Sequence, residues 1–571
     1  MFRIPYGISN FERIRTNNFL YVDKTHFIHK IENHSYLMYL RPRRFGKSLF
    51  FSMLDCYYDV ESASKFDELF NGLYIHENQT KYRNCYYMLR FNFSGIQNTE
   101  TEGLEEGFVS VVKDGVRQFI NRYELDIELP NEDSAAATLR ALLTSFSDLK
   151  LSHKIYILID EYDHFTNSLL SGDGEGFLSI LRRGGFVRSF YEVIKERTET
   201  GIVERIFITG VMSVTLDSMT SGFNIATKIT TDIDFAAMMG FTEYEVKELL
   251  KSTYLKSVQS KESVNLTIEE QASIYKIFVE NYNGYLFSRR SSTKVFNSTL
   301  IMYYLKHYLP HKLSPESLID MNLNQTGATI ESLVGLKNRE QNYQVIERVL
   351  GEKQVYGTLQ PFINIDEKFD EDDLITLLFN IGLLTIEGFD METQFKIPNK
   401  IIENIYLQYL SELTQRYSEY ALDLSKQKQA IIEVGRKGEI DSLTALVSEF
   451  LMHTSPRNTI KFDEKYIKLV YMMLLTYSDQ FSIYDEFTAH QGYGNLVILK
   501  APNSSAKYEV LLELKYIKKS NTNDIKIEKE LAQGISQIEE YMKDERLAKR
   551  EDLKRFVIVF SGFEVIRLQE V

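Results

Sequence analysis

Tryptophan is absent from this chain of 571 residues, and only two cysteines and nine prolines occur in it. Two cysteines, Cys56 and Cys85, are too few for a disulfide framework or for a zinc site built from cysteines. No apolar run reaches the roughly 18 residues that a membrane-spanning helix requires. The N-terminal residues MFRIPYGISNFERIR lack the apolar stretch of a signal peptide. The sequence therefore predicts a cytoplasmic globular protein with no membrane partner.

Aromatic and charged residues are plentiful by contrast. The chain contains 36 Tyr and 37 Phe, enough to fill several cores, and hydrophobic and charged residues make up 44% and 26% of it. These proportions are typical of a folded globular protein and exclude a low-complexity or disordered one. At roughly 150 residues per domain, the length predicts about three to four domains.

The formal net charge of −14 argues against a uniformly basic nucleic-acid-binding protein, but the charge is uneven. Residues 1–50 carry nine Lys and Arg against three Asp and Glu, a net +6, whereas residues 51–430 carry −18 and residues 431–571 carry −2. The basic N-terminal segment indicates a ligand that contains phosphate. The nearly neutral C-terminal segment could lie against DNA if its charges segregate by face.

Short apolar runs alternate with helical stretches through the first 240 residues, which predicts βαβ units and a parallel sheet. The run Ile155-Tyr-Ile-Leu-Ile159 is apolar throughout, as expected of a central strand that is buried on both faces. The expected strands are 35–40, 86–93, 155–160 and 204–209. The expected helices are 47–58, 104–124, 135–148 and 176–197.

The pattern changes after residue 240 and becomes mostly helical. A helix near 370–379, followed by two strand-like segments around a polar turn, is typical of a winged-helix-like module. The last 120 residues predict a compact α/β unit. Its expected elements are a helix at 463–477, strands at 480–487, 494–500 and 508–515, a helix at 527–543 and a strand at 555–560. We therefore expect an α/β protein with domains at 1–240, 241–410, 411–455 (a helical connector) and 456–571.

A phosphate-binding signal follows the first of these strands. The run Arg41-Pro-Arg-Arg-Phe-Gly-Lys-Ser48 lies between an apolar strand and a helical stretch, which is the context of a P-loop. In such a loop Lys47 reaches the β- and γ-phosphates of a nucleotide, and the Ser48 hydroxyl binds Mg²⁺. Arg41 stands where the usual pattern has glycine, and the alternative is a chance Gly-Lys-Ser at a helix start. The predicted nucleotide-binding residues are Arg41, Pro42, Arg43, Arg44, Phe45, Gly46, Lys47, Ser48 and Leu49.

Polar residues end two of the other predicted strands. Asp160 and Glu161 follow Ile155–Ile159, a Walker B pattern in which the first acid holds the metal and the second polarises water. Thr209 ends the next strand, where its hydroxyl could contact the γ-phosphate or position water. The structural alternatives are a helix N-cap for Asp160 and a simple turn for Thr209. Four arginines are candidate arginine fingers or, alternatively, solvated surface residues: Arg182, Arg183, Arg188 and Arg205.

These residues resemble those of the bacterial AAA-ATPase-like proteins that carry a C-terminal PD-(D/E)XK nuclease-like domain. The resemblance covers nearly the whole chain. It rests on Tyr21-Val-Asp-Lys-Thr25, Arg41–Leu49, Ile159–Asp163, Ser221–Asn224, Gly240–Glu243, Tyr282–Tyr285 and Ile397–Lys400. It implies a P-loop ATPase core that uses ATP and Mg²⁺, a restriction-endonuclease-like C-terminal fold, and a role in defence or mobile-element control. It also accounts for Arg41 at the first position of the loop.

The same resemblance implies a set of C-terminal site residues. Glu513 and Lys515 form the Glu-x-Lys element, in which the acid holds Mg²⁺ and the lysine orients or activates water. Glu464 matches the acid of the preceding helix, and Gln537 matches the glutamine of the following one. Asn495 stands where the family has a metal-binding Asp, and an amide binds Mg²⁺ more weakly than a carboxylate. Tyr493 also replaces the usual arginine.

The Asn495 substitution leaves two interpretations open. Either the site is degraded and the domain only binds nucleic acid, or Asp485 or Glu486 on the neighbouring strand supplies the missing carboxylate. The leading hypothesis is an ATPase coupled to a nuclease-like domain that acts on or binds DNA or RNA. The alternatives are a nucleotide-regulated signalling scaffold and a nuclease whose P-loop has a structural role. A homo-oligomer is compatible with all three.

Overall fold

The computed structural model of this protein describes most of the chain. The described residues are 2–96, 101–164, 185–213, 224–251, 255–256, 266–320, 326–336, 338–361, 363, 369–418, 422–454, 463–476, 478, 480–485 and 495–571. They divide into two compact units. The first comprises residues 1–312, 320–349 and 354–402, and the second comprises residues 313–319, 350–353 and 403–571. Among these residues, no helix is long and apolar enough to cross a membrane.

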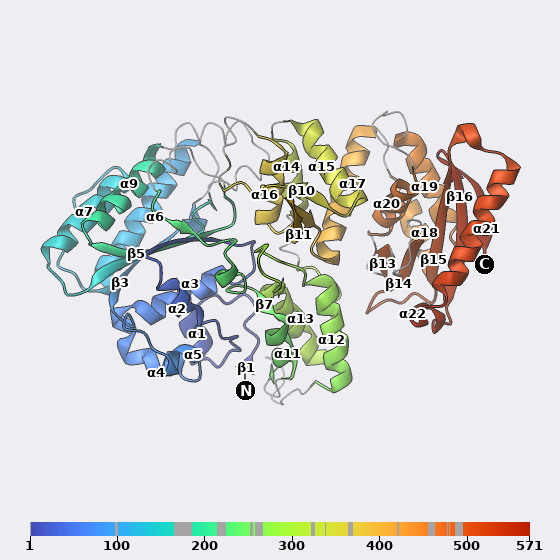
Figure 1. Ribbon diagram of the computed structural model, residues 1–571. Coiled ribbons are helices and arrows are strands. Elements are labelled where there is room, and N and C mark those ends of the chain that lie inside the picture. Colours follow the sequence, from blue (N-terminus) through green and yellow to red (C-terminus); the bar gives the residue numbers. More distant parts are fainter. Residues whose placement is uncertain are drawn as a thin grey trace. The chain divides into compact units, whose positions relative to one another are not determined.

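The first unit is built on a five-stranded parallel sheet of order β3-β4-β5-β2-β6 (Figure 1). Strand β5 therefore lies between β2, which precedes the P-loop, and β4, which ends in Asp160. The strands are β2 (Tyr36–Leu40), β3 (Tyr86–Asn92), β4 (Lys154–Asp160), β5 (Val203–Gly210) and β6 (Thr227–Lys228). The four longer strands correspond to the four predicted from the sequence, and the α/β class is confirmed.

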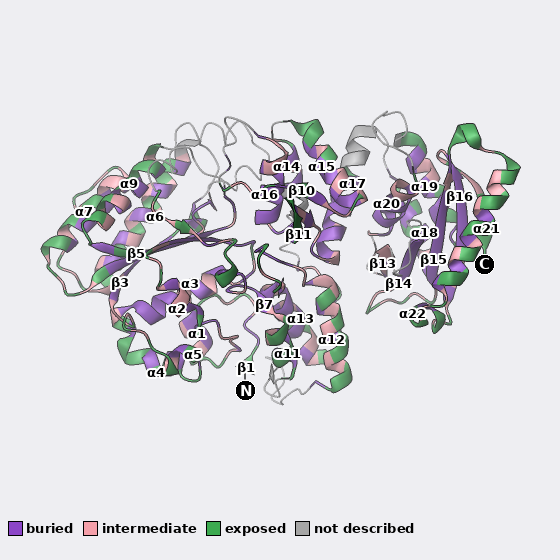
Figure 2. Ribbon diagram, in the orientation of Figure 1, coloured by how far each residue is buried: buried purple, intermediate pink, exposed green. Residues whose placement is uncertain are grey.

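Helices cover both faces of this sheet. One face packs its aliphatic side chains against α6 (Thr101–Arg122), α7 (Ala135–Asp148) and α9 (Gly185–Glu199). The other face packs against α3 (Lys47–Tyr58), and α1 (Phe11–Thr16) and α4 (Phe66–Phe70) lie beside α3. Figure 2 shows the strands buried between these layers, while the outer sides of α6, α7 and α9 are exposed. Residues 176–184 of the expected helix at 176–197 lie outside the described residues.

The rest of the first unit is mostly helical, with small sheets. Its helices include α11 (Glu243–Lys251), α12 (Ile268–Asn281), α13 (Ser298–His311), α14 (Thr326–Val334) and α15 (Arg339–Gly351). The expected helix and hairpin are present as α16 (Glu371–Asn380), β11 (Thr385–Asp390) and β12 (Glu392–Lys396). With β10 (Val355–Gly357), the hairpin forms a three-stranded antiparallel sheet of order β10-β12-β11.

The second unit contains a mixed sheet of order β13-β14-β15-β16-β17. Its strands are β13 (Phe481–Asp485), β14 (Asn495–Lys500), β15 (Glu509–Ile517), β16 (Leu553–Ser561) and β17 (Glu564–Glu570). Helix α20 (Glu464–Leu475) packs against β13 and β15, while α21 (Asp524–Tyr541) packs against β15, β16 and β17. Helices α17 (Lys400–Ser418), α18 (Leu424–Lys437) and α19 (Asp441–Thr454) precede the sheet. The sequence prediction missed β17, an exposed edge strand in which polar residues interrupt the apolar pattern.

Candidate functional site

The P-loop begins at the carboxyl end of β2 and ends at the start of α3. Gly46 is the N-cap of α3 and has a φ of 93°, in the left-handed region that glycine adopts without steric cost. The first N–H groups of a helix have no partner within the helix and point toward anions. The loop therefore presents backbone donors beside Lys47 and Ser48, as the sequence predicts.

Lys47 is buried, and its ammonium group donates hydrogen bonds to carbonyls of its own loop. Lys47 Nζ lies 2.8 Å from the Arg41 carbonyl oxygen and 2.9 Å from that of Pro42. Burial lowers the pKa of Lys47 to about 8, and the nearby Asp160 opposes this shift. These two carbonyls are weak substitutes for a charged partner, so an anion in the site would gain a strong charge-assisted contact.

Asp160 and Ser48 are the residues that the sequence predicts as metal ligands at this site. Asp160 is buried at the tip of β4, and burial raises the pKa of its carboxyl group. A hydrogen bond from Ser48 and the charge of Lys47 act in the opposite direction. A hydroxyl and a carboxylate are hard oxygen ligands of the kind that Mg²⁺ takes, so both residues fit the predicted role.

Glu161 follows Asp160 in a strained conformation. Its φ is 50°, which is uncommon for a residue with a side chain and occurs often at functional positions. Glu161 Oε2 lies 3.3 Å from His164 Nδ1, and this interaction lowers the pKa of Glu161. The carboxylate is therefore ionised at neutral pH and lines the same cavity as Lys47.

Strand β5 brings Thr209 and Gly210 beside these acids. Thr209 is fully buried, and its hydroxyl has no hydrogen-bond partner among the residues that the structure describes. Asp163 accepts hydrogen bonds from the backbone N–H groups of Val211 and Met212, the latter at 2.6 Å. Asp163, two residues after Glu161, thus connects the segment after β4 to the end of β5.

The side chains of the P-loop also anchor the loop to the helical region. The Arg41 guanidinium is buried, lies 4.3 Å from the Tyr39 ring centroid and 4.1 Å from that of Phe287, and donates to the Thr230 carbonyl. The Phe45 ring packs edge-on against Tyr285 and Phe287. The Arg41 side chain therefore holds the loop in place, which explains how a large residue replaces the usual glycine.

Several of the motifs that support the family resemblance meet around this loop. The Gly240 N–H donates to the Phe45 carbonyl at 3.0 Å. Tyr285 packs against Phe45, and the preceding Gly284 approaches the Pro398 carbonyl so closely that a Cβ would lie 2.0 Å from its oxygen. Residues more than 350 positions apart thus form one structure around the P-loop, although the sequence gives no indication of their contact.

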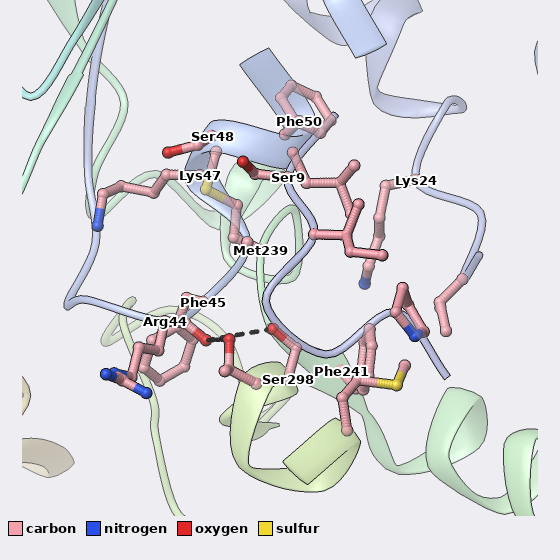
Figure 3. A pocket seen from close by; sticks show the side chains of 18 of the residues that line it. Ser9, Lys24, Arg44, Phe45, Lys47, Ser48, Phe50, Met239, Phe241 and Ser298 are labelled. Atoms are coloured by element: carbon pink, nitrogen blue, oxygen red, sulfur yellow. Dashed lines mark hydrogen bonds between the residues drawn. The ribbon is translucent and has the colours of Figure 1, made fainter. Parts of the chain in front are cut away.

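A cavity of about 580 Å³ opens beside the P-loop (Figure 3). Ser48 and Phe50 on α3 lie on one side of it, and Ser298 on α13 lies on another. Further walls come from residues 5–9, 20–22 and 238–241 and from Lys24. The cavity combines the cationic and hydroxyl groups of the loop with apolar side chains, which suits a ligand with a phosphate end and an apolar ring.

The candidate arginine fingers do not lie in this cavity as far as the structure describes them. Arg205 is at the start of β5, the end opposite Thr209, and donates to the His34 carbonyl and the Tyr86 hydroxyl. It is buried, so the alternative of a solvated surface residue is also wrong for it. Arg188 pairs with Glu192 on the surface of α9. Arg182 and Arg183 lie outside the described residues.

The predicted C-terminal residues meet on one face of the second sheet. Asn495 on β14 lies directly opposite Glu513 on β15, so both side chains point toward α21. Lys515 shares this face, and its Nζ lies 3.0 Å from Glu513 Oε1. All three side chains are buried. Burial raises the pKa of Glu513, whereas Lys515 lowers it.

Two further predicted residues border this cluster. Glu464, the first residue of α20, accepts a hydrogen bond from the Tyr516 N–H at 3.2 Å. Burial raises the pKa of Glu464, and the nearby Lys515 lowers it. The Gln537 carbonyl oxygen on α21 is buried without a hydrogen-bond partner in the described part of the chain. The sequence reasoning missed Tyr541, whose pKa is raised by burial and by the neighbouring Glu513, while Asn495 lowers it. Its spacing of four residues from Gln537 puts both on one face of α21 and could have revealed it.

Asp485 does not replace the missing carboxylate. It pairs with Leu496 rather than Asn495 in the register of β13 and β14, so its side chain lies on the opposite face from Glu513. Its carboxylate forms an ion pair with Lys353 at 3.1 Å. Glu486 and Tyr493 lie outside the described residues. Within the described ranges, no three His, Cys, Asp or Glu side chains are grouped as a metal site.

Comparisons with known proteins find a family match for the region of the P-loop and another for the region of the C-terminal cluster. Residues 5–220 match the family model of a predicted AAA-ATPase, and residues 462–570 match that of the PD-(D/E)XK nuclease superfamily. A protein of Azotobacter chroococcum mcd 1, described as an uncharacterized protein in the vnfD 5′ region, is 30% identical over 252 residues. This match covers 43% of the present chain and 44% of the relative, less than half of each.

Proposed function

Because the chain combines an AAA-ATPase-like domain with a PD-(D/E)XK nuclease superfamily domain, we propose that it is a Mg²⁺-dependent ATPase coupled to a nucleic-acid-binding module. The observation that carries the ATPase half is the arrangement of Lys47, Ser48 and Asp160. Among the residues that the structure describes, the buried ammonium of Lys47 donates only to backbone carbonyls, 2.8 and 2.9 Å away. A triphosphate supplies the charge that this group lacks.

Each residue has a distinct task in this proposal. Lys47 and the N–H groups at the start of α3 bind the phosphates, while Ser48 and Asp160 hold Mg²⁺. The metal, when bound, neutralises charge that develops on the phosphate oxygens. Glu161 orients the attacking water and accepts its proton as the general base, and the Thr209 hydroxyl supplies a further polar contact at the same sheet edge.

Calorimetry with ATP and Mg²⁺ tests this assignment. Lys47→Ala should weaken binding at least about tenfold, because a hydrogen bond to a charged group contributes about 1.5–3 kcal/mol. Lys30→Ala, which removes an exposed cation that pairs with Asp234, is the matched control and should bind as the parent does. Equal affinity in the parent and Lys47→Ala would rule out the P-loop assignment.

For the C-terminal domain we propose nucleic-acid binding with weakened cleavage. Asn495 contributes no negative charge beside Glu513, and Asp485 faces the other side of the sheet. The cluster therefore attracts Mg²⁺ less than a pair of carboxylates would. The same observation favours the second candidate function, a nucleotide-regulated scaffold that does not cut nucleic acid.

A cleavage assay separates active from inactive chemistry. Linear and single-stranded DNA and RNA would be incubated with the parent, Asn495→Asp or Glu513→Ala, each with Mg²⁺ or Mn²⁺ and with or without ATP. We expect cleavage by the parent to be weak, to rise in Asn495→Asp and to vanish in Glu513→Ala. Cleavage that survives Glu513→Ala would contradict the site. No cleavage by any variant would favour the scaffold or a purely binding module.

A further inference from the structure

The segment from Ser298 to Asp320 begins and ends at the same P-loop residue, Arg44. At its start, the Thr299 hydroxyl donates to the Arg44 carbonyl oxygen at 2.8 Å, and the Thr299 N–H donates to it at 3.2 Å. At its end, the Asp320 carboxylate forms an ion pair with the Arg44 guanidinium. The Tyr6 hydroxyl donates to the same carboxylate at 2.6 Å. Backbone and side chain of Arg44 are thus both held by one stretch of chain.

The middle of this stretch belongs to the other compact unit. Residues 313–319, hereafter the strap, pack with residues 403–571, whereas Lys312 and Asp320 on either side of the strap pack with the P-loop unit. Asn503 Nδ2 donates to the carbonyl oxygens of Ser314 and Pro315, both at 3.0 Å. Asn503 lies in the connection between β14 and β15, the strands that carry Asn495 and Glu513.

The Arg44–Asp320 pair is placed where a nucleotide would disturb it. The Arg44 side chain is 22% exposed and lines the P-loop cavity, whereas that of Asp320 is 3% exposed. Arg44 also has a φ of 71°, a strained backbone conformation that its contacts must maintain. A triphosphate in the cavity competes with Asp320 for the guanidinium. A buried carboxylate that loses a cationic partner is destabilised, which favours a rearrangement of Asp320 and the adjoining strap.

We propose that the Arg44–Asp320 pair is a nucleotide-sensing joint whose release changes the strap and, through Asn503, the connection between β14 and β15. This inference rests on the proposed binding of ATP in the P-loop cavity. It adds a positioning role for Asp320 and a route by which nucleotide occupancy reaches the C-terminal site. A ligand can shift the equilibrium between the formed and the broken Arg44–Asp320 pair only if it binds the two states with different affinity. A triphosphate does so here because it competes with Asp320 for Arg44.

Hydrogen exchange on the full chain, read by mass spectrometry with and without ATP and Mg²⁺, tests the joint. In the parent, ATP should speed exchange in peptides that cover 313–319 at least about fivefold, the lower range of a typical coupling. Asp320→Asn keeps an acceptor for Tyr6 but removes the charge. It should bind ATP at least as tightly as the parent, show fast strap exchange without ATP, and respond no further. Glu316→Gln, an exposed change within the strap, should behave like the parent.

Asn503→Ala tests the second step without touching the cavity. It should bind ATP as the parent does but lose the ATP response of peptides that cover 501–508. Arg44→Lys keeps a cation but loses the guanidinium group, so it should weaken the effect of ATP on strap exchange. This variant replaces Asp320→Asn as the test if Asp320→Asn does not fold. ATP binding without any change in strap exchange, or a full response in Asp320→Asn, would overturn the joint. A parent that binds no ATP would overturn the proposed function as well, a result that calorimetry distinguishes.

Discussion

The residues of the P-loop fall into two groups. Some are placed where they suit a bound ligand, and the others hold the loop in its conformation. Lys47 and Ser48 face groups that suit phosphate and metal, whereas Arg41 and Phe45 are packed among aromatic side chains. Both kinds of residue are needed, because backbone donors bind an anion tightly only if they are already oriented. Within the unusual Arg-Pro-Arg-Arg-Phe run, Arg41 and Phe45 thus anchor the loop, whereas Arg44 lines the cavity.

Glu161→Gln should leave ATP binding intact and slow hydrolysis at least about 100-fold, because an amide cannot accept a proton from water. Phosphate release under single-turnover conditions measures the change. Asp133→Asn removes an exposed acid on the same unit and should hydrolyse ATP at the parental rate. Unchanged turnover in Glu161→Gln would exclude Glu161 as the base, and Asp163, whose carboxylate already accepts backbone N–H groups, is the next acid along the chain.

The lowered pKa of Lys47 predicts proton uptake on nucleotide binding. With a pKa of about 8, Lys47 is mostly neutral in the free protein above that pH. Phosphate favours the ammonium form, so binding above pH 8 must take up a proton and affinity must fall as pH rises further. Calorimetry in buffers of different ionisation enthalpy measures this uptake. Lys47→Arg, which stays charged, should take up less than the parent at pH 9, and equal uptake would assign the proton to another group.

At the scale of secondary-structure elements, β5 determines how the two halves of the site meet. It separates β2 from β4, so the P-loop and Asp160 are joined across a third strand rather than side by side. Gly210 at its end allows the close approach of the segment after β4. A Cβ there would lie 2.4 Å from Asp163 Oδ1 and 2.5 Å from the Tyr162 ring.

Gly210→Ala should therefore destabilise the fold by about 1–3 kcal/mol, the usual cost of overpacking. It should also lower ATP turnover, because Tyr162 and Asp163 move with Glu161. The melting temperature and phosphate release are the measurements. Gly103→Ala, in helix α6 where a Cβ would meet no atom within 4 Å, is the matched control and should be neutral or slightly stabilising. Equal melting temperatures for the two variants would show that the strand end tolerates a side chain.

Helix α16 and the hairpin of β11 and β12, which the sequence predicts as a winged-helix-like module, carry mainly acidic groups. The helix is buried along most of its length and begins with Glu371, Asp372 and Asp373. The hairpin tip carries Asp390 and Glu392. An acidic, buried helix lacks the surface cations that contact nucleic-acid phosphates, so we do not expect α16 to contribute to the nucleic-acid binding that we propose for the C-terminal domain.

At the scale of the whole molecule, charge decides how nucleic acid can bind. A net charge of −14 repels a polyanion at long range, so binding must depend on a local group of cations. Lys518 and Lys519 are exposed just beyond the carboxyl end of β15, close in sequence to Lys515. They are the candidates for phosphate contacts beside the C-terminal cluster.

The affinity for DNA should accordingly fall steeply with salt, by about one power of the salt concentration for each phosphate contact. The double variant Lys518→Ala, Lys519→Ala should weaken binding at low salt and reduce the slope by about two. Filter binding over a salt series measures both quantities. Lys543→Ala with Lys549→Ala removes two exposed lysines of the same domain and should change neither. No binding by the parent at low salt would favour the scaffold.

The amino-acid sequence alone predicts the α/β class, the four main strands of the first sheet, the P-loop with its neighbouring acids, and the strand that carries Glu513 and Lys515. These features depend on local periodicity and on short spacings, which are written in consecutive residues. Only the folded chain shows that Arg41 is an anchor, that Asp485 faces away from Glu513, that Tyr541 lies beside Glu513, and that Asp320 pairs with Arg44. Register, sheet order and the meeting of distant segments depend on packing between residues tens to hundreds of positions apart, and no local pattern encodes them.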